Sequence, residues 1–198
     1  MIYEQYLSKE KMPDGFDHST EEIRFIDSEK DRKLYQSAIK LIKDEKPNEA
    51  RPILTNLMAR YKNTFFWACT VLRLSDAVLQ KEENAEDIDL GSKLVNDVVD
   101  SEIYSPVLFE GFEKWRAREQ FMNYGSSNTS EIPNKEYNRK RWKLVKVIKK
   151  YLITHPGDRW ATAQIDLLLA MPNIGRSGDY GNDNLGSLKN LTQHLRTF

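Results

Sequence analysis

The chain has 198 residues, enough for one domain or a short array of helical repeats with a sizeable hydrophobic core. Charged residues make up 30% of it and aromatic residues 11%, and this aromatic content excludes a disordered polyelectrolyte. Thirty basic residues balance thirty acidic ones, so no net charge favours nucleic acid or an anionic membrane, and any such preference has to come from local clusters.

Apolar residues recur three and four positions apart along most of the chain, which predicts helices and no sustained strand. Ser19 with Glu22, and Ser28 with Asp31, have the spacing of capping boxes and predict two helix starts. Pro47 suits the first turn of the next helix, because its φ is fixed at a helical value and it has no N–H to leave unpaired.

The remaining helices are bounded by caps and helix breakers. One helix is expected to begin near Thr64, and the next to run from about Ala85 to Val99. A further helix is expected to begin at Pro106, and a long one to run from about Lys135 to Thr154. His155, Pro156 and Gly157 break this long helix, Asp158 can cap the following one, and Pro172 ends it. A short helix carrying Leu188, Leu191 and Leu195 is expected to close the chain.

The fold class predicted from these segments is all-α, with about eight or nine helices in one domain spanning residues 1–198. The helices are expected to form successive antiparallel hairpins, arranged either as an irregular α-solenoid or as a helical bundle. Residues 1–18 are expected to form a flexible N-terminal arm. Two segments rich in Ser, Gly and Asn, residues 123–134 and 172–184, are expected to be loops.

One predicted hairpin, residues 34–62, resembles a tetratricopeptide repeat (TPR). Leu34, Ala38 and Leu41 stand where that motif has Trp, Gly and Tyr, and Ala50 and Leu54 stand at the spacing of its Ala and Phe. The identities depart from the motif elsewhere, since Ser37 replaces a Leu and Lys62 stands near the closing Pro. The resemblance covers about one repeat. It implies a TPR-like scaffold that presents a groove to a protein or peptide partner and supplies no catalytic residues.

Four basic residues share one face of the helix expected at residues 135–154. This basic stripe consists of Arg139, Lys143, Lys146 and Lys150. Lys140, Arg141 and Lys149 are expected to add to it. Such a surface can bind phosphate backbones, acidic peptides or an anionic surface, or it can be the solvated face of an amphipathic helix.

Acidic residues gather in the segment 82–102. Glu82, Glu83, Glu86, Asp87, Asp89, Asp97 and Asp100 lie there. This segment would repel phosphates if it lay near the basic stripe. The two opposed patches can instead pair within the molecule or between two copies, so charge here is expected to select a partner more than to stabilise the fold.

No motif predicts a cofactor, a metal site or a catalytic residue. His18, His155 and His194 are scattered and lack zinc-ligand spacing, and Gly175, Gly178 and Gly181 lack the preceding strand of a phosphate-binding loop. Cys69, the single cysteine, lies in an apolar stretch, where a buried thiol with a raised pKa is expected. Carboxylate pairs such as Glu110 with Glu113 leave acid–base catalysis open, although helix surfaces carry such pairs routinely.

The function expected from these features is a non-catalytic protein–protein interaction module or scaffold. The alternative is binding of RNA or DNA through the basic stripe, and an enzyme is less favoured. The first ten residues lack the basic and apolar regions of a signal peptide, and no apolar run reaches the roughly 18 residues of a membrane span. A cytoplasmic protein is therefore expected, unless Met1 replaces a removed signal peptide.

Overall fold

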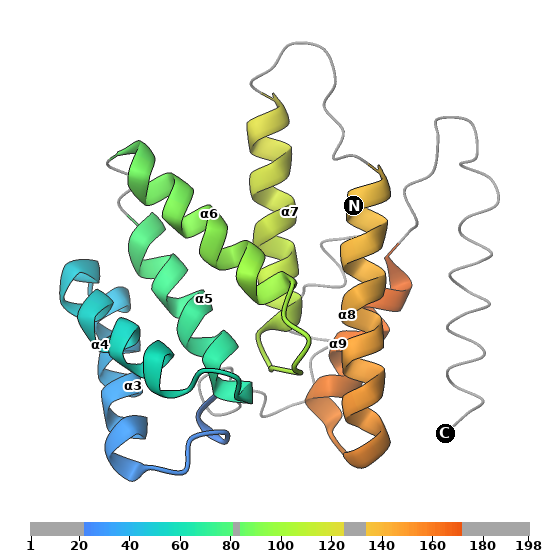
Figure 1. Ribbon diagram of the computed structural model, residues 1–198, viewed down its shortest axis with the longest axis horizontal. Coiled ribbons are helices and arrows are strands. Elements are labelled where there is room, and N and C mark those ends of the chain that lie inside the picture. Colours follow the sequence, from blue (N-terminus) through green and yellow to red (C-terminus); the bar gives the residue numbers. More distant parts are fainter. Residues whose placement is uncertain (1–21, 81–83, 125–133, 172–198) are drawn as a thin grey trace. The chain divides into compact units, whose positions relative to one another are not determined.

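The computed structural model describes residues 22–80, 84–124 and 134–171, and every regular element in these residues is an α-helix (Figure 1). The prediction of an all-α fold is therefore confirmed. The helices are α3 (Glu29–Lys43), α4 (Pro47–Arg60), α5 (Phe65–Leu79), α6 (Ala85–Val99), α7 (Leu108–Tyr124), α8 (Asn134–Thr154) and α9 (Arg159–Ala170). Among the described residues, none of these helices combines the length and apolarity needed to cross a bilayer.

The described residues fall into two compact units, and the boundary between the units lies within α7. The first unit comprises the described part of Asp17–Arg118 and contains α3 to α6 with the first part of α7. The second comprises the described part of Glu119–Phe198 and contains α8 and α9.

The starts of α3 and α9 agree with the capping residues read from the sequence, whereas the Glu22 of the other predicted capping box is followed by a turn at residues 24 and 25 and not by a continuing helix. The side chain of Ser28 accepts a hydrogen bond from the backbone N–H of Asp31 at 3.3 Å, and Asp158 accepts one from Ala161 at 2.9 Å. Each bond satisfies one of the backbone donors that a helix leaves unpaired in its first turn. Pro47 occupies the first position of α4, as predicted.

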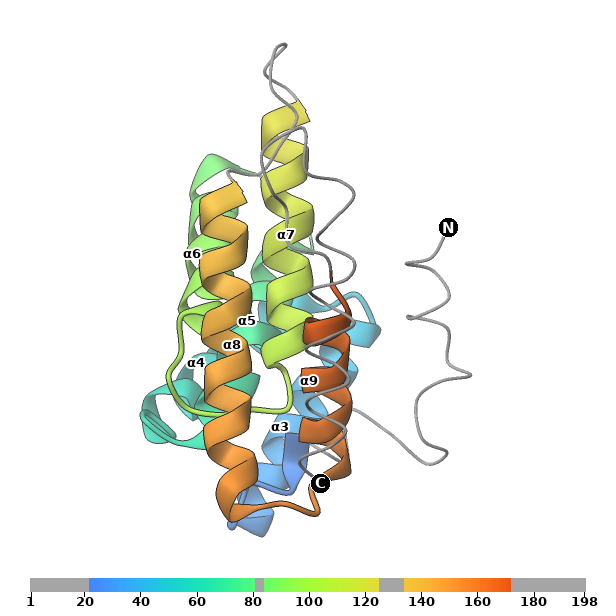
Figure 2. The same ribbon diagram turned by 90° about the vertical axis from the view of Figure 1, so that its right-hand side faces the viewer.

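In the first unit, each helix packs against the one that precedes it along the chain, from α3 through to α6 (Figures 1 and 2). Two glycines allow close approach of the later helices. A Cβ atom added to Gly91 of α6 would lie 2.3 Å from the side chain of Leu79 of α5, and one added to Gly111 of α7 would lie 2.8 Å from Val98 of α6. The axes of these helices can therefore come closer than a residue with a side chain would permit.

The turns on either side of α4 are tight. Glu45 lies between α3 and α4 with a φ of 59°, and Asn63 lies between α4 and α5 with a φ of 65°. A positive φ costs an ordinary residue about 1 kcal/mol or more, although asparagine tolerates it better than glutamate does. The packing that these turns allow between neighbouring helices offsets the conformational free energy of the two positive φ angles.

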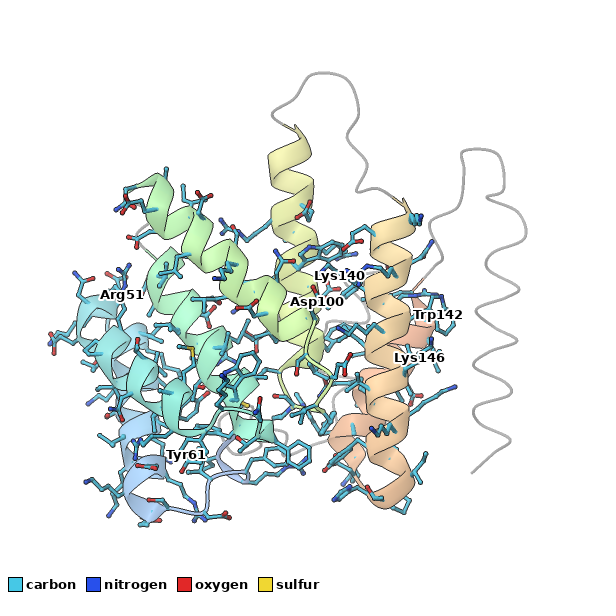
Figure 3. All side chains as sticks on the ribbon, viewed as in Figure 1. Arg51, Tyr61, Asp100, Lys140, Trp142 and Lys146 are labelled. Atoms are coloured by element: carbon cyan, nitrogen blue, oxygen red, sulfur yellow. The ribbon has the colours of Figure 1, made fainter. Side chains whose placement is uncertain are left out.

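Aromatic rings and ion pairs fix α3 to α4 and α5. The ring of Phe66 in α5 makes edge contacts with Tyr35 and Tyr61, at centroid distances of 4.7 and 5.0 Å. Asp31 of α3 accepts hydrogen bonds from Arg60 at 2.7 Å and from the hydroxyl of Tyr61 at 2.9 Å (Figure 3). Asp31 is 5% exposed, so these charge-assisted bonds supply the partners that its buried carboxylate needs.

Arg51 of α4 links three helices at the C-terminal end of α5 (Figure 3). Its guanidinium donates to the carbonyls of Ala77 and Val78 at 3.3 and 3.2 Å and to both carboxylate oxygens of Asp87 in α6. The last carbonyls of a helix have no partner within the helix and carry partial negative charge, so a cation there is stabilising.

Several boundaries differ from the sequence-based expectation by a few residues. The helix expected from Pro106 begins at Leu108, and it continues through residues 123 and 124, which were expected to lie in a loop. Residue 134, expected to end that loop, is already in α8. The expected N-terminal arm at residues 1–18, the rest of the 123–134 loop, the 172–184 loop and the closing helix lie outside the described residues.

Candidate functional site

The basic stripe lies on the outer face of α8. A helix turns about 100° per residue, so its four members fall within roughly 60° of one another. Lys146 and Lys150 are exposed, Arg139 is exposed, and Lys143 is half-buried. Apolar side chains fill the opposite face and are buried: Leu144, Val145, Ile148 and Leu152. The hydrophobic burial of that face fixes the direction in which the four cations point.

Two of the three neighbouring basic residues do not belong to this surface. Lys140 is 2% exposed and Arg141 is 1% exposed (Figure 3 labels Lys140). The prediction that they add to the stripe is therefore wrong. Arg141 is displaced by about 200° from Arg139 around the helix, which puts it among the apolar positions. There it donates to the carbonyl of Met171, and its guanidinium carbon lies 4.8 Å from the centre of the Trp142 ring.

The charge of the stripe is partly balanced at its N-terminal end. Arg139 donates to both carboxylate oxygens of Glu136, at 2.9 and 2.7 Å. Both side chains are largely exposed, so the pair contributes little to stability and leaves the guanidinium accessible to another anion. The excess positive charge is therefore concentrated toward Lys146, Lys149 and Lys150, which are all exposed.

An aliphatic residue lies in line with the cations. Ile153 is 80% exposed and is displaced by only about 40° from Arg139 around the helix. Near it, the end of α8 is held by Tyr151, whose ring stacks on that of His155 and whose hydroxyl donates to Asp158 at 2.8 Å. A single exposed aliphatic residue is common on solvated surfaces, so what distinguishes Ile153 is its place in line with the cations.

A second charged face lies on α6. Glu86, Asp89 and Asp97 are exposed and share one side of the helix, and the exposed Asp100 caps its C-terminal end. Together we call these four residues the acidic stripe. Leu90, 45% exposed, and the exposed Lys93 lie among them. Burial raises the pKa of Asp97, and the charge of Asp100 raises it further while Lys93 lowers it. Of the other acidic residues in this segment, Asp87 is paired with Arg51. Glu82 and Glu83 lie outside the described residues.

An ion network lies elsewhere, in the first unit, and connects the chain before α3 with α5 and α7. We call it the buried ion network because Glu22 and Arg73 at its centre are 4% and 14% exposed, while its outer members are 22 to 33% exposed. It comprises Glu22, Arg73, Asp76, Glu110 and Lys114. Arg73 is at its centre, because its guanidinium donates to Glu22 at 2.6 Å, to Asp76 at 2.8 Å and to Glu110 at 2.5 and 2.8 Å. Lys114 contacts Asp76 and Glu110, and the Tyr35 hydroxyl donates to Glu22.

The network shifts the pKa values of Glu110 and Arg73. Burial alone would raise the pKa of Glu110, but hydrogen bonds from Arg73 and the charges of Arg73 and Lys114 outweigh it and lower the pKa to about 2. Burial would likewise lower the pKa of Arg73, but its bonds to Glu110 and the charge of Glu22 raise it. The ion pairs join the chain before α3 to α5 and α7, so the network acts as a structural clamp between these elements.

The carboxylate pair that left acid–base catalysis open is not brought together for that role. Glu110 is bonded to Arg73 and Lys114, whereas Glu113 accepts a hydrogen bond from Arg116 at 2.8 Å. A low pKa makes Glu110 a poor proton donor or acceptor at neutral pH. The buried thiol of Cys69 has a raised pKa, chiefly through burial, as the sequence predicted.

Comparison of the whole chain with protein-family models, with curated proteins and with solved structures found no match. The chain's own surfaces therefore carry the functional argument.

Within the part of the chain that the structure describes, no three His, Cys, Asp or Glu side chains are grouped so that they could hold a metal ion. His155 is exposed at the end of α8. His18, His194 and the three regularly spaced glycines lie outside the described residues.

Sequence reasoning missed the buried ion network. Its one local signal was Arg73, a basic residue in the otherwise apolar helix α5, with Asp76 three positions later. A cation within a helix whose neighbouring turns are buried needs anions from other helices to pair with it. The presence of Arg73 in α5 therefore indicates an internal ion network. That Glu22 and Glu110 are its partners could not be predicted, because they lie 51 and 37 residues away from Arg73 along the chain and reach it only through the packing of the helices.

Proposed function

We propose that the chain is a non-catalytic protein-interaction module that contacts its partner through the basic stripe on α8. The observation that carries this proposal is the exposed Ile153 in line with Lys146 and Lys150. Interfaces between proteins combine charges with apolar contacts that are buried on binding, whereas contacts to a phosphate backbone use cations and polar donors and need no aliphatic side chain.

The helical scaffold supports the same proposal. Proteins of paired helices commonly present one rigid helix face to a partner. The packing of α3 against α4 is compatible with a TPR-like hairpin, because three of the five resembling positions, Ala38, Ala50 and Leu54, are fully buried. The other two, Leu34 and Leu41, are half-buried. Rigid presentation lowers the conformational entropy lost on binding.

The test is affinity capture from an extract of the source cells, with two versions of the full chain as bait. The first is wild type, and the second has the stripe neutralised by R139Q, K143Q, K146Q and K150Q. A matched control neutralises four exposed lysines elsewhere, by K30Q, K40Q, K43Q and K62Q. A partner retained by wild type and by the control but lost from the stripe variant supports the proposal. Identical sets of captured proteins from all three baits contradict it.

RNA or DNA binding is the second candidate function, and the run of exposed cations Lys146, Lys149 and Lys150 favours it. Each phosphate contact releases condensed counterions, so binding should weaken steeply with salt, and neutralising the four stripe residues should reduce the slope of log K against log salt by about 3 to 4. Fluorescence anisotropy with single-stranded RNA and duplex DNA tests this. No binding at about 50 mM salt rules out this function, because electrostatic affinity is strong there.

A further inference from the structure

The described part of the chain carries two exposed charged stripes of opposite sign on two different helices. The acidic stripe on α6 has four carboxylates with Lys93 among them, and the basic stripe on α8 has four cations with Glu136 beside Arg139. With these neighbours included, the acidic stripe carries a net charge of −3, and the basic stripe carries +3, or +4 with the exposed Lys149 beside it. The two surfaces are therefore opposite in sign and similar in charge.

The stripes also match in length. Glu86 to Asp100 on α6 and Arg139 to Ile153 on α8 each cover about four helical turns, or roughly 21 Å. In both, the charged residues recur every three or four positions, so each forms a straight row along its helix. Two such rows can lie against each other along their whole length.

Each stripe contains an exposed aliphatic side chain. Among the described residues, the large hydrophobic side chains that are exposed are Phe65, Leu90 and Ile153. Phe65 packs against the ring of Phe25 at a centroid distance of 5.3 Å. Leu90 lies in the acidic stripe and Ile153 at the end of the basic stripe. The apolar surface that a contact would bury therefore coincides with the charges that would orient it.

We propose that the acidic stripe of one copy of the chain binds the basic stripe of a second copy. The inference rests on the proposed function and names the partner as the chain itself. Because the two contacting stripes differ, two copies can engage reciprocally in a closed two-fold pair, or successive copies can assemble head to tail through heterologous contacts. Complementary charge sets the orientation, and burial of Leu90 and Ile153 adds affinity.

The composition of the stripes agrees with a protein partner of this kind. The net charge of the whole chain is zero, so copies do not repel each other as a uniformly charged protein would. Lys93 is the one cation within the acidic stripe and opposes the basic stripe, so its replacement by Glu is expected to tighten the association.

The test is a charge swap in the full-length chain, measured by sedimentation velocity. Variant A reverses the basic stripe by K143E, K146E and K150E. Variant B reverses the acidic stripe by E86K, D89K and D97K. A control reverses three exposed lysines outside both stripes, by K30E, K43E and K62E. Circular dichroism spectra and thermal unfolding identify any variant that fails to fold.

Wild type and control should associate with rising concentration, and the association should weaken by about tenfold or more when salt is raised from about 50 to 300 mM. Variants A and B should each stay monomeric, because both of their stripes then carry the same sign. An equimolar mixture of A and B should associate again, since each stripe then meets its complement. L90S or I153S should weaken wild-type association by about tenfold.

Wild-type protein that stays monomeric at every concentration overturns the proposal, as does a mixture of A and B that does not associate. Association that persists in A or in B alone also overturns it. These outcomes are separate from failure of the proposed function. A monomeric chain whose stripe still captures another protein retains the interaction role but not self-association, and the same monomer binding RNA through α8 favours the nucleic-acid alternative.

Discussion

Replacement of Arg73 is expected to destabilise the first unit strongly. Arg73→Met removes the cation but keeps much of the aliphatic side chain, and it leaves Glu22, 4% exposed, without the guanidinium that pairs with it. Breaking a buried ion pair by removing one partner costs about 3 to 5 kcal/mol, because a buried charge is left uncompensated. Since a domain is stable by only about 5 to 15 kcal/mol, this loss is a large fraction of the total.

Urea unfolding at pH 7, followed by circular dichroism, measures this loss. Arg73→Lys should be intermediate, because it keeps the charge but cannot form the paired bonds to Glu110. Lys33→Met is the matched control. Lys33 pairs with Glu29 at 3.6 Å, but both side chains are largely exposed, so its loss should cost less than about 1 kcal/mol. If Arg73→Met is no more destabilising than Lys33→Met, the network does not stabilise the unit as described.

The same network predicts how stability depends on pH. The folded-state pKa of Glu110 is lowered from 4.5 to about 2, so its contribution to stability is complete above about pH 5 and is lost as the pH falls toward 2. The shift corresponds to a stabilisation of about 3 kcal/mol. Arg73→Met should flatten this part of the curve, leaving what Lys114 still contributes. An equally steep loss in the variant would contradict Arg73 as a main cause.

Three further substitutions test the packing and the turns by thermal or urea unfolding. Glu45→Gly should stabilise the chain by about 1 kcal/mol, since its φ of 59° suits glycine, and destabilisation would mean that the side chain contributes more than the strain costs. Gly91→Ala should destabilise by about 1 to 3 kcal/mol, because the new methyl group would overlap Leu79, and an unchanged midpoint would show that α5 and α6 can separate freely. Asp158→Ala should cost about 1 kcal/mol through loss of the cap on α9, whereas Asp158→Asn should largely preserve it; equal losses would rule out the cap as the cause.

Helix positions could be predicted from the sequence because their signals are local. Ser28, Pro47 and Asp158 act on the residues that follow within one turn, and the structure places helix starts at all three. The ends of α7 were less predictable. Its polar residues near 123 and 124 resemble a loop in composition, but the helix continues through them.

The basic stripe on α8 was predicted in part from the sequence. Spacing alone placed Arg139, Lys146 and Lys150 on the exposed face. The same spacing, applied to Arg141, would have placed it on the apolar face, where charge-based reasoning does not expect a guanidinium. The buried ion network was beyond sequence reasoning for a different reason: which carboxylates reach Arg73 depends on how distant helices pack.

The order of the network along the chain constrains how the first unit is completed during synthesis. Arg73 contacts Glu22, 51 residues before it, and Glu110, 37 residues after it. A nascent chain that has released α3 to α6 but not α7 therefore exposes a guanidinium with only part of its anions. Because domains fold as units once their last element has emerged from the ribosome, the first turn of α7 completes the first unit rather than merely extending it. A fragment ending at Val99 would lack Glu110 and Lys114. Its Arg73 would therefore keep only part of the anions that surround the guanidinium in the intact chain.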